Sequence, residues 1–246
     1  MSEPKRKTYR VSWFSTGVSS AVATKLLCPD IDEIIYTHIE DQHPDTIRFI
    51  KDCETWFSKP VTTLQSELGS VASAIFKARY VNGPGGAACT RMLKRQVRQR
   101  WEQDNIEKYP LEYVWGLDAT EQHRADRILK TMPEFAHRFP LIEKRIGKNE
   151  AHEILRASGI KRPAMYDLGY HNNNCVGCIK GGMGYWNKIR TDFPSVFSQR
   201  ALMEREIGAS CINGVFLDEL DPNAGAHDAP ISDECGILCE LQALPK

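Results

Sequence analysis

The stretch Phe14-Ser15-Thr16-Gly17-Val18-Ser19-Ser20 constrains the fold of this chain most strongly. It follows Tyr9-Arg10-Val11-Ser12-Trp13, whose alternating β-branched and aromatic residues are typical of a strand. It precedes residues 21–27, Ala-Val-Ala-Thr-Lys-Leu-Leu, which form a helical pattern. The segment therefore predicts a strand, a turn of small residues and a helix. In that arrangement, the backbone N–H groups at the helix N-terminus can bind an anion.

The composition of this turn suits phosphate. The hydroxyls of Ser15, Thr16, Ser19 and Ser20 can donate to phosphate oxygens, and Gly17 permits close approach or a positive φ. An ordinary strand-to-helix turn with serine at the N-cap would use the same residues, so both interpretations stay open at this point. The turn is not a Walker loop, because no Gly-Lys-Ser/Thr follows it.

Composition narrows the class of protein. The 246 residues are 41% hydrophobic and 26% charged, with a formal net charge of zero, which disfavours a globally basic nucleic-acid binder but allows a local basic face. No apolar run is long enough to span a bilayer, and residues 1–7 lack the apolar core of a signal peptide, so we expect a cytoplasmic location and no membrane partner. In that compartment, eight cysteines indicate metal or redox chemistry rather than a disulfide scaffold.

Further strand and helix patterns alternate along the chain. Residues 33–39 read as a buried strand that ends in the polar cluster 40–45, and strands are also expected at 60–64 and 112–117. We expect a short strand or extended edge at 140–143 as well. Successive strand–helix–strand crossovers favour an α/β fold with a doubly wound, Rossmann-like parallel sheet, whose ligand edge would carry the polar cluster.

The pattern changes at Leu168, after which cysteine, glycine and asparagine become frequent. This predicts an α/β domain over residues 8–167 and a cysteine-containing, helical and irregular C-terminal module over residues 168–246. Within the module we expect helices at 185–190 and 194–207.

A second basic region follows the glycine-rich stretch 82–86. In this region we expect a helix that begins at Cys89 and carries basic residues through Arg100. Such a charge run is usually a solvated helix face. Its position at a helix start beside a glycine loop also favours a phosphate-facing role for Arg91 or Lys94.

The cysteines form two close pairs. Cys175 and Cys178 are spaced Cys-x-x-Cys, and Cys235 and Cys239 lie close together in the tail. Two such pairs can form a tetrahedral thiolate site for zinc or an iron–sulfur cluster, although they can also be reduced, partly buried thiols. Cys89 is a third candidate, because a helix N-terminus favours its thiolate. The remaining cysteines lie in helix ends or apolar surroundings and are expected to be structural: Cys28, Cys53 and Cys211.

Several motifs follow one another in a characteristic order. They occupy residues 15–20, 40–46, 116–124, 140–142, 163–170 and 233–237. The set resembles the phosphoadenosine phosphosulfate (PAPS) reductase family, within the adenine-nucleotide α-hydrolase or PP-loop superfamily. The resemblance runs from about residue 9 to residue 240. In detail the chain looks most like the short family members found in phages and mobile elements.

The resemblance implies an adenine nucleotide, ATP or PAPS/APS, at the carboxyl edge of a five-stranded parallel sheet. It implies phosphate contacts from the first loop, at Ser15, Thr16, Gly17, Ser19 and Ser20. Asp41 would hold Mg²⁺ or a ribose hydroxyl. Arg124, with Arg91 or Lys94, would neutralise phosphate or sulfate charge, and Arg124 would take part in catalysis.

The resemblance also implies roles for the cysteines. Cys89, Cys175 and Cys178 match positions that ligate a 4Fe-4S cluster in cluster-bearing relatives. The family's tail histidine is replaced by Leu238, and Cys239 is added. Cys235 is therefore either the nucleophile that attacks sulfur to form a thiosulfonate, or a metal ligand together with Cys239.

Two other departures bear on the reaction. Ser19 replaces the loop aspartate of the ATP-pyrophosphatase branch, which weakens an ATP-adenylating assignment. Ala88 replaces one of the paired cysteines of cluster-bearing reductases, so a fourth ligand would come from elsewhere.

Three functions follow from these patterns. The first is reduction of an adenylyl sulfate by a thioredoxin-like thiol donor, and it needs a free Cys235. The second is an ATP-dependent sulfur transferase that modifies tRNA or DNA, and it needs a basic surface, for which the helix from Arg91 to Arg100 is the local candidate. The third is a non-catalytic nucleotide sensor, which would bind nucleotide without turnover.

Overall fold

The computed structural model describes residues 7–83, 86–212 and 214–225. The chain divides into two compact units that interleave in sequence. The sheet unit comprises Met1–Thr37, Pro44–Leu64 and Val97–Ala164, and the cysteine unit comprises His38–His43, Gln65–Gln96 and Met165–Lys246. The cysteine unit thus includes two segments that precede residue 168 in the sequence. The predicted boundary at 167/168 lies near the last crossing between the units and stays a prediction.

The sheet unit is built on a five-stranded sheet with the order β3-β2-β1-β6-β7. The strands are β1 (Tyr9–Trp13), β2 (Glu33–His38), β3 (Thr62–Gln65), β6 (Leu111–Val114) and β7 (Ala136–Arg138). β1 pairs in parallel with β2 and with β6, and β6 pairs in parallel with β7. The predicted five-stranded, Rossmann-like α/β fold is confirmed.

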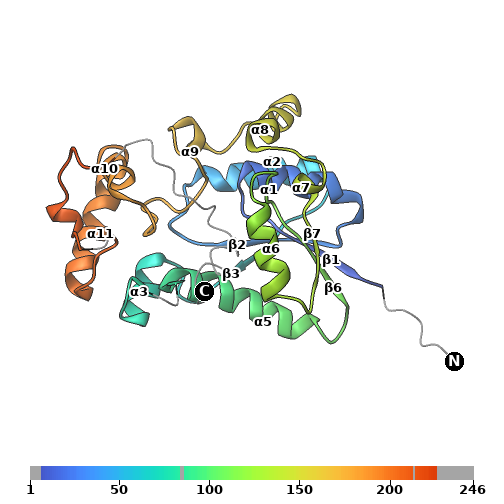
Figure 1. Ribbon diagram of the computed structural model, residues 1–246, viewed down its shortest axis with the longest axis horizontal. Coiled ribbons are helices and arrows are strands. Elements are labelled where there is room, and N and C mark those ends of the chain that lie inside the picture. Colours follow the sequence, from blue (N-terminus) through green and yellow to red (C-terminus); the bar gives the residue numbers. More distant parts are fainter. Residues whose placement is uncertain (1–6, 84–85, 213, 226–246) are drawn as a thin grey trace. The chain divides into compact units, whose positions relative to one another are not determined.

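Helices cover both faces of this sheet (Figure 1). They are α1 (Val18–Leu27), the short 3-10 helix η1 (Cys28–Asp30), α2 (Asp45–Phe57), α5 (Gln96–Asn105), α6 (Gln122–Thr131), α7 (Pro140–Glu143) and α8 (Lys148–Ala157). Successive residues of a strand point to opposite faces, and β1 shows the consequence. The Ser12 hydroxyl hydrogen-bonds with that of Thr24 in α1 at 2.7 Å, whereas the Trp13 ring packs edge-on against Trp101 in α5. Alternation along β1 therefore produces the two helical layers.

One element differs from the prediction. Residues 140–143 form the helix α7, and the last strand, β7, lies just before them. Pro140 at the start of α7 has its φ preset for a helix and needs no N–H partner there. Glu143 adds a contact, because its carboxylate accepts the N–H of Phe139 at 3.0 Å. The apolar Pro-Leu-Ile run, which suggested an extended edge, instead starts a helical turn.

The cysteine unit is mainly helical. Its elements are α3 (Val71–Ala78), the strand pair β4 (Asn82–Gly83) and β5 (Gly86–Ala87), α4 (Ala88–Thr90), the π-helix η2 (Arg91–Arg95), α9 (Ala164–Asp167), α10 (Met183–Asp192), α11 (Pro194–Ile207) and the 3-10 helix η3 (Leu217–Glu219). The helices expected at 185–190 and 194–207 are confirmed as α10 and α11. Helix α9 begins at the last residue of the sheet unit.

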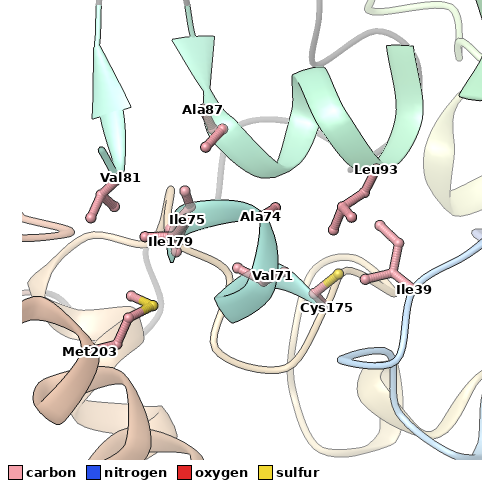
Figure 2. Close-up of a cluster of buried hydrophobic side chains, with 11 residues drawn as sticks. Ile39, Val71, Ala74, Ile75, Val81, Ala87, Leu93, Cys175, Ile179 and Met203 are labelled. Carbon is pink, nitrogen blue, oxygen red and sulfur yellow. The ribbon is translucent and has the colours of Figure 1, made fainter. Parts of the chain in front are cut away.

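An apolar cluster joins distant segments within the cysteine unit (Figure 2). It contains Ile39, which directly follows β2, Val71 and Ile75 from α3, Leu93 from η2 and Cys175. Burial of such side chains contributes roughly 1.5–3 kcal/mol each relative to exposure. The cluster explains why residues 38–43 and 65–96 belong to this unit even though the chain passes through the sheet unit between them.

Candidate functional site

The β1–α1 loop carries an unusual backbone conformation. Gly17 is the N-cap of α1 and has an extended backbone, with φ at −84°. Thr16, not Gly17, adopts the left-handed conformation, with φ at 64°. Of the two roles considered for Gly17, a positive φ is not used, and close approach of a ligand stays a prediction. A β-branched residue in this region is an outlier that the surrounding structure must hold in place, and such residues cluster at functional sites.

Hydrogen bonds inside the loop hold this conformation. The N–H of Ser15 donates to Oγ of Ser20 at 3.0 Å, and the Thr16 hydroxyl donates to the Ser15 carbonyl at 2.5 Å. Thr16, Ser19 and Ser20 are at most 2% exposed. No side chain hydrogen-bonds to cap α1 at Gly17. The hydroxyls of Thr16 and Ser20 thus shape the loop at the N-terminus of α1, a position at which helices commonly bind anions.

Gly116 brings the end of β6 against this loop. A Cβ at Gly116 would lie 2.4 Å from the Ser20 Cα and 2.8 Å from the Ser20 N. β1 and β6 are neighbours where the strand order reverses, which is where open α/β sheets bind ligands at their carboxyl ends. The sequence motif includes Gly116 but assigns it no role. A glycine close to the end of a buried strand is the signal that could have identified it.

Arg124 lies in the first turn of α6, on the segment that follows β6. It is buried and forms an ion pair with Glu121. Glu121 also accepts the N–H of Asp118 at 3.0 Å, and the Asp118 carboxylate accepts the N–H and hydroxyl of Thr120 at 2.8 and 2.6 Å. The turn that leads into α6 is therefore held by its own carboxylates, which orient Arg124.

Asp41 lies in the cysteine unit and is already engaged. Its Oδ2 accepts the N–H of Val71 at 2.6 Å, and its Oδ1 pairs with Arg200. Its backbone carbonyl accepts the N–H of Val176 at 2.8 Å. A role for Asp41 in holding Mg²⁺ or a ribose hydroxyl stays a prediction, and it would compete with these contacts.

The Cys175–Cys178 turn is tightly organised. The Tyr185 hydroxyl accepts the N–H of Cys178 at 2.8 Å and donates to the Cys175 carbonyl at 3.4 Å. Burial raises the pKa of Tyr185 well above its usual value, so the phenol stays protonated and can donate. Gly177 has φ at 70°, and a Cβ there would lie 2.7 Å from Val196. Only glycine therefore fits the centre of this turn without strain.

A small cavity in the cysteine unit brings several predicted residues together. It has a volume of about 10 Å³ and is lined by Ile39, Val71, Cys89, Thr90, Lys94, Cys175, Cys178 and Ile179. Such a volume holds about one water-sized species. Figure 2 shows Cys175 beside Ile39, below Leu93. Three cysteines predicted as metal ligands, and one lysine predicted to contact phosphate, thus share a single cavity.

The metal prediction stays open. Among the described residues, no group of three or more His, Cys, Asp or Glu side chains is arranged to hold a metal ion. The thiol donors at the cavity suit zinc or an iron–sulfur cluster in chemical type. Cys235 and Cys239, predicted as further ligands and, for Cys235, as the nucleophile, lie outside the described residues.

Several basic side chains between Arg91 and Arg100 are buried or contact other side chains of the protein. The Arg91 guanidinium lies 5.6 Å from the Tyr80 ring centre, and Lys94 is buried at the cavity. Arg98 is buried in an ion pair with Glu102. A π-helical turn has more residues per turn than an α-helix, so η2 changes which side chains face inward. The local basic face is correspondingly smaller than the sequence indicates.

The other cysteines lie in environments that suppress thiolate formation. Burial raises the thiol pKa of Cys28 and of Cys53, and burial together with Glu204 raises that of Cys211. The Cys28 thiol also donates to the Phe57 carbonyl at 3.0 Å. These environments agree with the structural roles expected for all three.

Comparisons with known proteins give matches among solved structures. No protein-family model and no curated protein matches the chain. Matches among solved structures include the crystal structure of phosphoadenylyl-sulfate (PAPS) reductase from Candida auris in a phosphate complex. The two chains share 11% sequence identity, and the matched region covers 72% of this chain and 83% of the reductase chain, with a TM-score of 0.48. In the described part of the chain, no helix is long and apolar enough to cross a membrane.

Proposed function

We propose that the chain binds the phosphate groups of an adenine nucleotide at the carboxyl ends of β1 and β6. The observation that carries this proposal is the contact between Gly116 and Ser20, where the strand order reverses. At such a switch point, a small-residue loop and a helix N-terminus provide N–H donors and a favourable dipole for phosphate. The proposal that the nucleotide carries adenine, as in ATP or PAPS/APS, rests on the sequence resemblance.

The loop, the first turn of α1 and Arg124 would take distinct parts in this binding. The first turn of α1 supplies backbone N–H donors, and the Thr16 conformation sets the path of the chain toward them. Arg124 adds positive charge, which Glu121 partly balances and orients. Because Ser19 stands where an aspartate would support adenylation, the loop favours binding of an already activated nucleotide over its activation.

The proposed reaction is reduction of an adenylyl sulfate. The Cys235 thiolate attacks the sulfate sulfur, the S–O bond to the nucleotide phosphate breaks, and a cysteine thiosulfonate and the nucleotide product form. A thiol of a thioredoxin-like donor then attacks the cysteine sulfur and releases sulfite. The donor's second thiol resolves the mixed disulfide, so the donor dithiol supplies both electrons. The cavity with three cysteines and Lys94 supports sulfur chemistry in this chain.

The cysteines around the cavity fit a metal group in donor type. Cys89, Cys175 and Cys178, with Cys235 or Cys239, would hold a 4Fe-4S cluster or zinc ion, which would supply a local electrophilic or redox-active centre. If Cys235 and Cys239 are both ligands, the reductase loses its nucleophile.

Calorimetric titration of the full chain with PAPS, APS and ATP tests the binding proposal. We expect Gly17→Val to weaken binding at least tenfold, about 1.4 kcal/mol, because a branched side chain would obstruct the approach of phosphate to the loop. Ser198→Ala, which removes an exposed hydroxyl in the other unit, is the matched control. Circular dichroism confirms that both variants fold. An unchanged affinity in Gly17→Val would contradict the proposal.

Sulfite release from PAPS or APS with a dithiol donor tests the reaction. Cys235→Ser should abolish sulfite release without changing nucleotide affinity, whereas Cys28→Ser should retain both. If the protein binds nucleotide but releases no sulfite with either substrate, the reductase proposal fails. Retention of tRNA or DNA on a filter at low salt would then favour the sulfur transferase.

A further inference from the structure

We propose that Asp41 and Arg200 form a clamp that positions the Cys175–Cys178 turn at the cysteine cavity, and that both are positioning residues for the cysteine site. This deepens the thiol part of the proposed function and is independent of nucleotide binding. It gives Asp41 a different role from the Mg²⁺ or ribose contact that the sequence resemblance implies.

Arg200 contacts the turn directly. It projects from α11, and its side chain is only 5% exposed. Its Nε donates to the Gly177 carbonyl at 3.4 Å, and its terminal NH₂ pairs with the Asp41 carboxylate. A single guanidinium therefore bridges the centre of the cysteine turn and Asp41, as its fork of donors allows.

Asp41 continues the connection to a second part of the cavity wall. Its backbone carbonyl accepts the Val176 N–H at 2.8 Å, and the next residue, Gln42, forms an antiparallel bridge with Cys175. Its carboxylate accepts the N–H of Val71, the first residue of α3. Val71 and Cys175 both line the cavity. The clamp thus ties two walls of one cavity through Asp41.

Loss of either Asp41 or Arg200 should weaken the clamp strongly. Removal of one member of a buried ion pair leaves the other charge without compensation, which costs far more than loss of an exposed pair. The Asp41 carboxylate also lies at the N-terminus of α3, where the helix dipole favours a negative charge. The same helix α11 offers a matched control, because Arg205 pairs with Asp218 at 2.8 Å and both side chains are more than 40% exposed.

The test measures how fast each cysteine reacts with iodoacetamide in the full-length, reduced protein, by mass spectrometry of quenched time points. The variants are Asp41→Asn, Arg200→Met, Arg200→Lys and the control Arg205→Met. Cys28 and Cys53 are internal references, because both are buried in the sheet unit. Nucleotide affinity is measured on the same preparations.

We expect Asp41→Asn and Arg200→Met to accelerate alkylation of Cys175 and Cys178 about tenfold, because local opening of the turn exposes their thiols. Cys28 and Cys53 should react at unchanged rates, Arg200→Lys should be intermediate, and Arg205→Met should match the wild type. Equal acceleration at all cysteines would indicate global destabilisation and would overturn the proposal. Unchanged alkylation in Asp41→Asn with weakened nucleotide binding would also overturn it and would restore Asp41 as a nucleotide or Mg²⁺ contact.

Discussion

The β1–α1 loop and the cysteine cavity are built in opposite ways. The loop is nearly continuous in sequence, since residues 15–20 form it and Gly116 packs against it. The cavity draws its walls from four separated segments, near residues 39, 71, 89–94 and 175–179. The loop therefore depends on local conformation, whereas the cavity depends on long-range contacts such as the Asp41–Arg200 clamp. Four predictions test this contrast, from the largest expected effect to the smallest.

The largest effect should come from Gly116→Ala in the sheet unit. The new methyl group would overlap the Ser20 backbone, so we expect a loss of about 3 kcal/mol in the free energy of unfolding. Urea denaturation measures this loss. Gly147→Ala is the matched control, because a Cβ at Gly147 would enter open space with no contact within 4 Å, and it should change stability by less than about 1 kcal/mol. Similar losses in both variants would show that the Gly116 contact is not specific.

Tyr185→Phe should have the next largest effect, in the cysteine unit. It leaves the buried N–H of Cys178 without its acceptor, which costs about 1–3 kcal/mol. We expect a lower urea midpoint and faster alkylation of Cys178. Tyr109→Phe, at a more exposed ring, is the control and should alter neither. A stable Tyr185→Phe protein with unchanged Cys178 reactivity would contradict a role for this hydroxyl in holding the turn.

Ser70→Ala should have a smaller effect, because it acts on one helix end. Ser70 is the N-cap of α3, and its Oγ accepts the N–H of Ser73 at 3.2 Å. Loss of such a cap costs about 1 kcal/mol. Thermal unfolding measures this loss of stability. Ser70→Asp should keep the stability of the wild type, because aspartate is an equally good cap. The absence of a difference between Ala and Asp would argue against this cap.

The smallest effect should be a dependence of stability on pH. The Trp115 indole donates to Nδ1 of His137 at 3.1 Å, and Nε2 of His137 lies 2.8 Å from the Met132 carbonyl, so the ring is neutral with its proton on Nε2. Burial lowers the pKa of His137 below its usual value, and burial together with Arg162 and Lys148 lowers that of His152. The unfolded chain thus binds protons more readily.

The stabilising contribution of these histidines should therefore be present above pH about 6.5 and decline as the pH falls below it. Urea midpoints measured between pH 7.5 and 5.5 would show the decline. We expect a smaller decline in the double variant His137→Gln/His152→Gln. An equal pH dependence in wild type and variant would exclude these two histidines as its source.

Much of the fold could be predicted from sequence, because its signals are local. The strand before the first loop, the helix after it and the helices α10 and α11 follow from residue patterns within each segment. The sequence does not predict the α7 helix, because a short apolar run has no distinctive period and fits an extended edge equally well. At the site, the sequence indicated the loop and the cysteines, but not the role of Gly116, Tyr185 or Arg200.

The sequence by itself determined the α/β class and the position of the small-residue turn, because both follow from patterns within contiguous residues. Only the tertiary structure decided that Thr16 takes the left-handed conformation, that Lys94 and Arg98 turn inward, and that Asp41 pairs with Arg200. The physical reason is that φ strain, burial of charge and ion pairing between residues 41 and 200 depend on neighbours that meet only after the chain has folded.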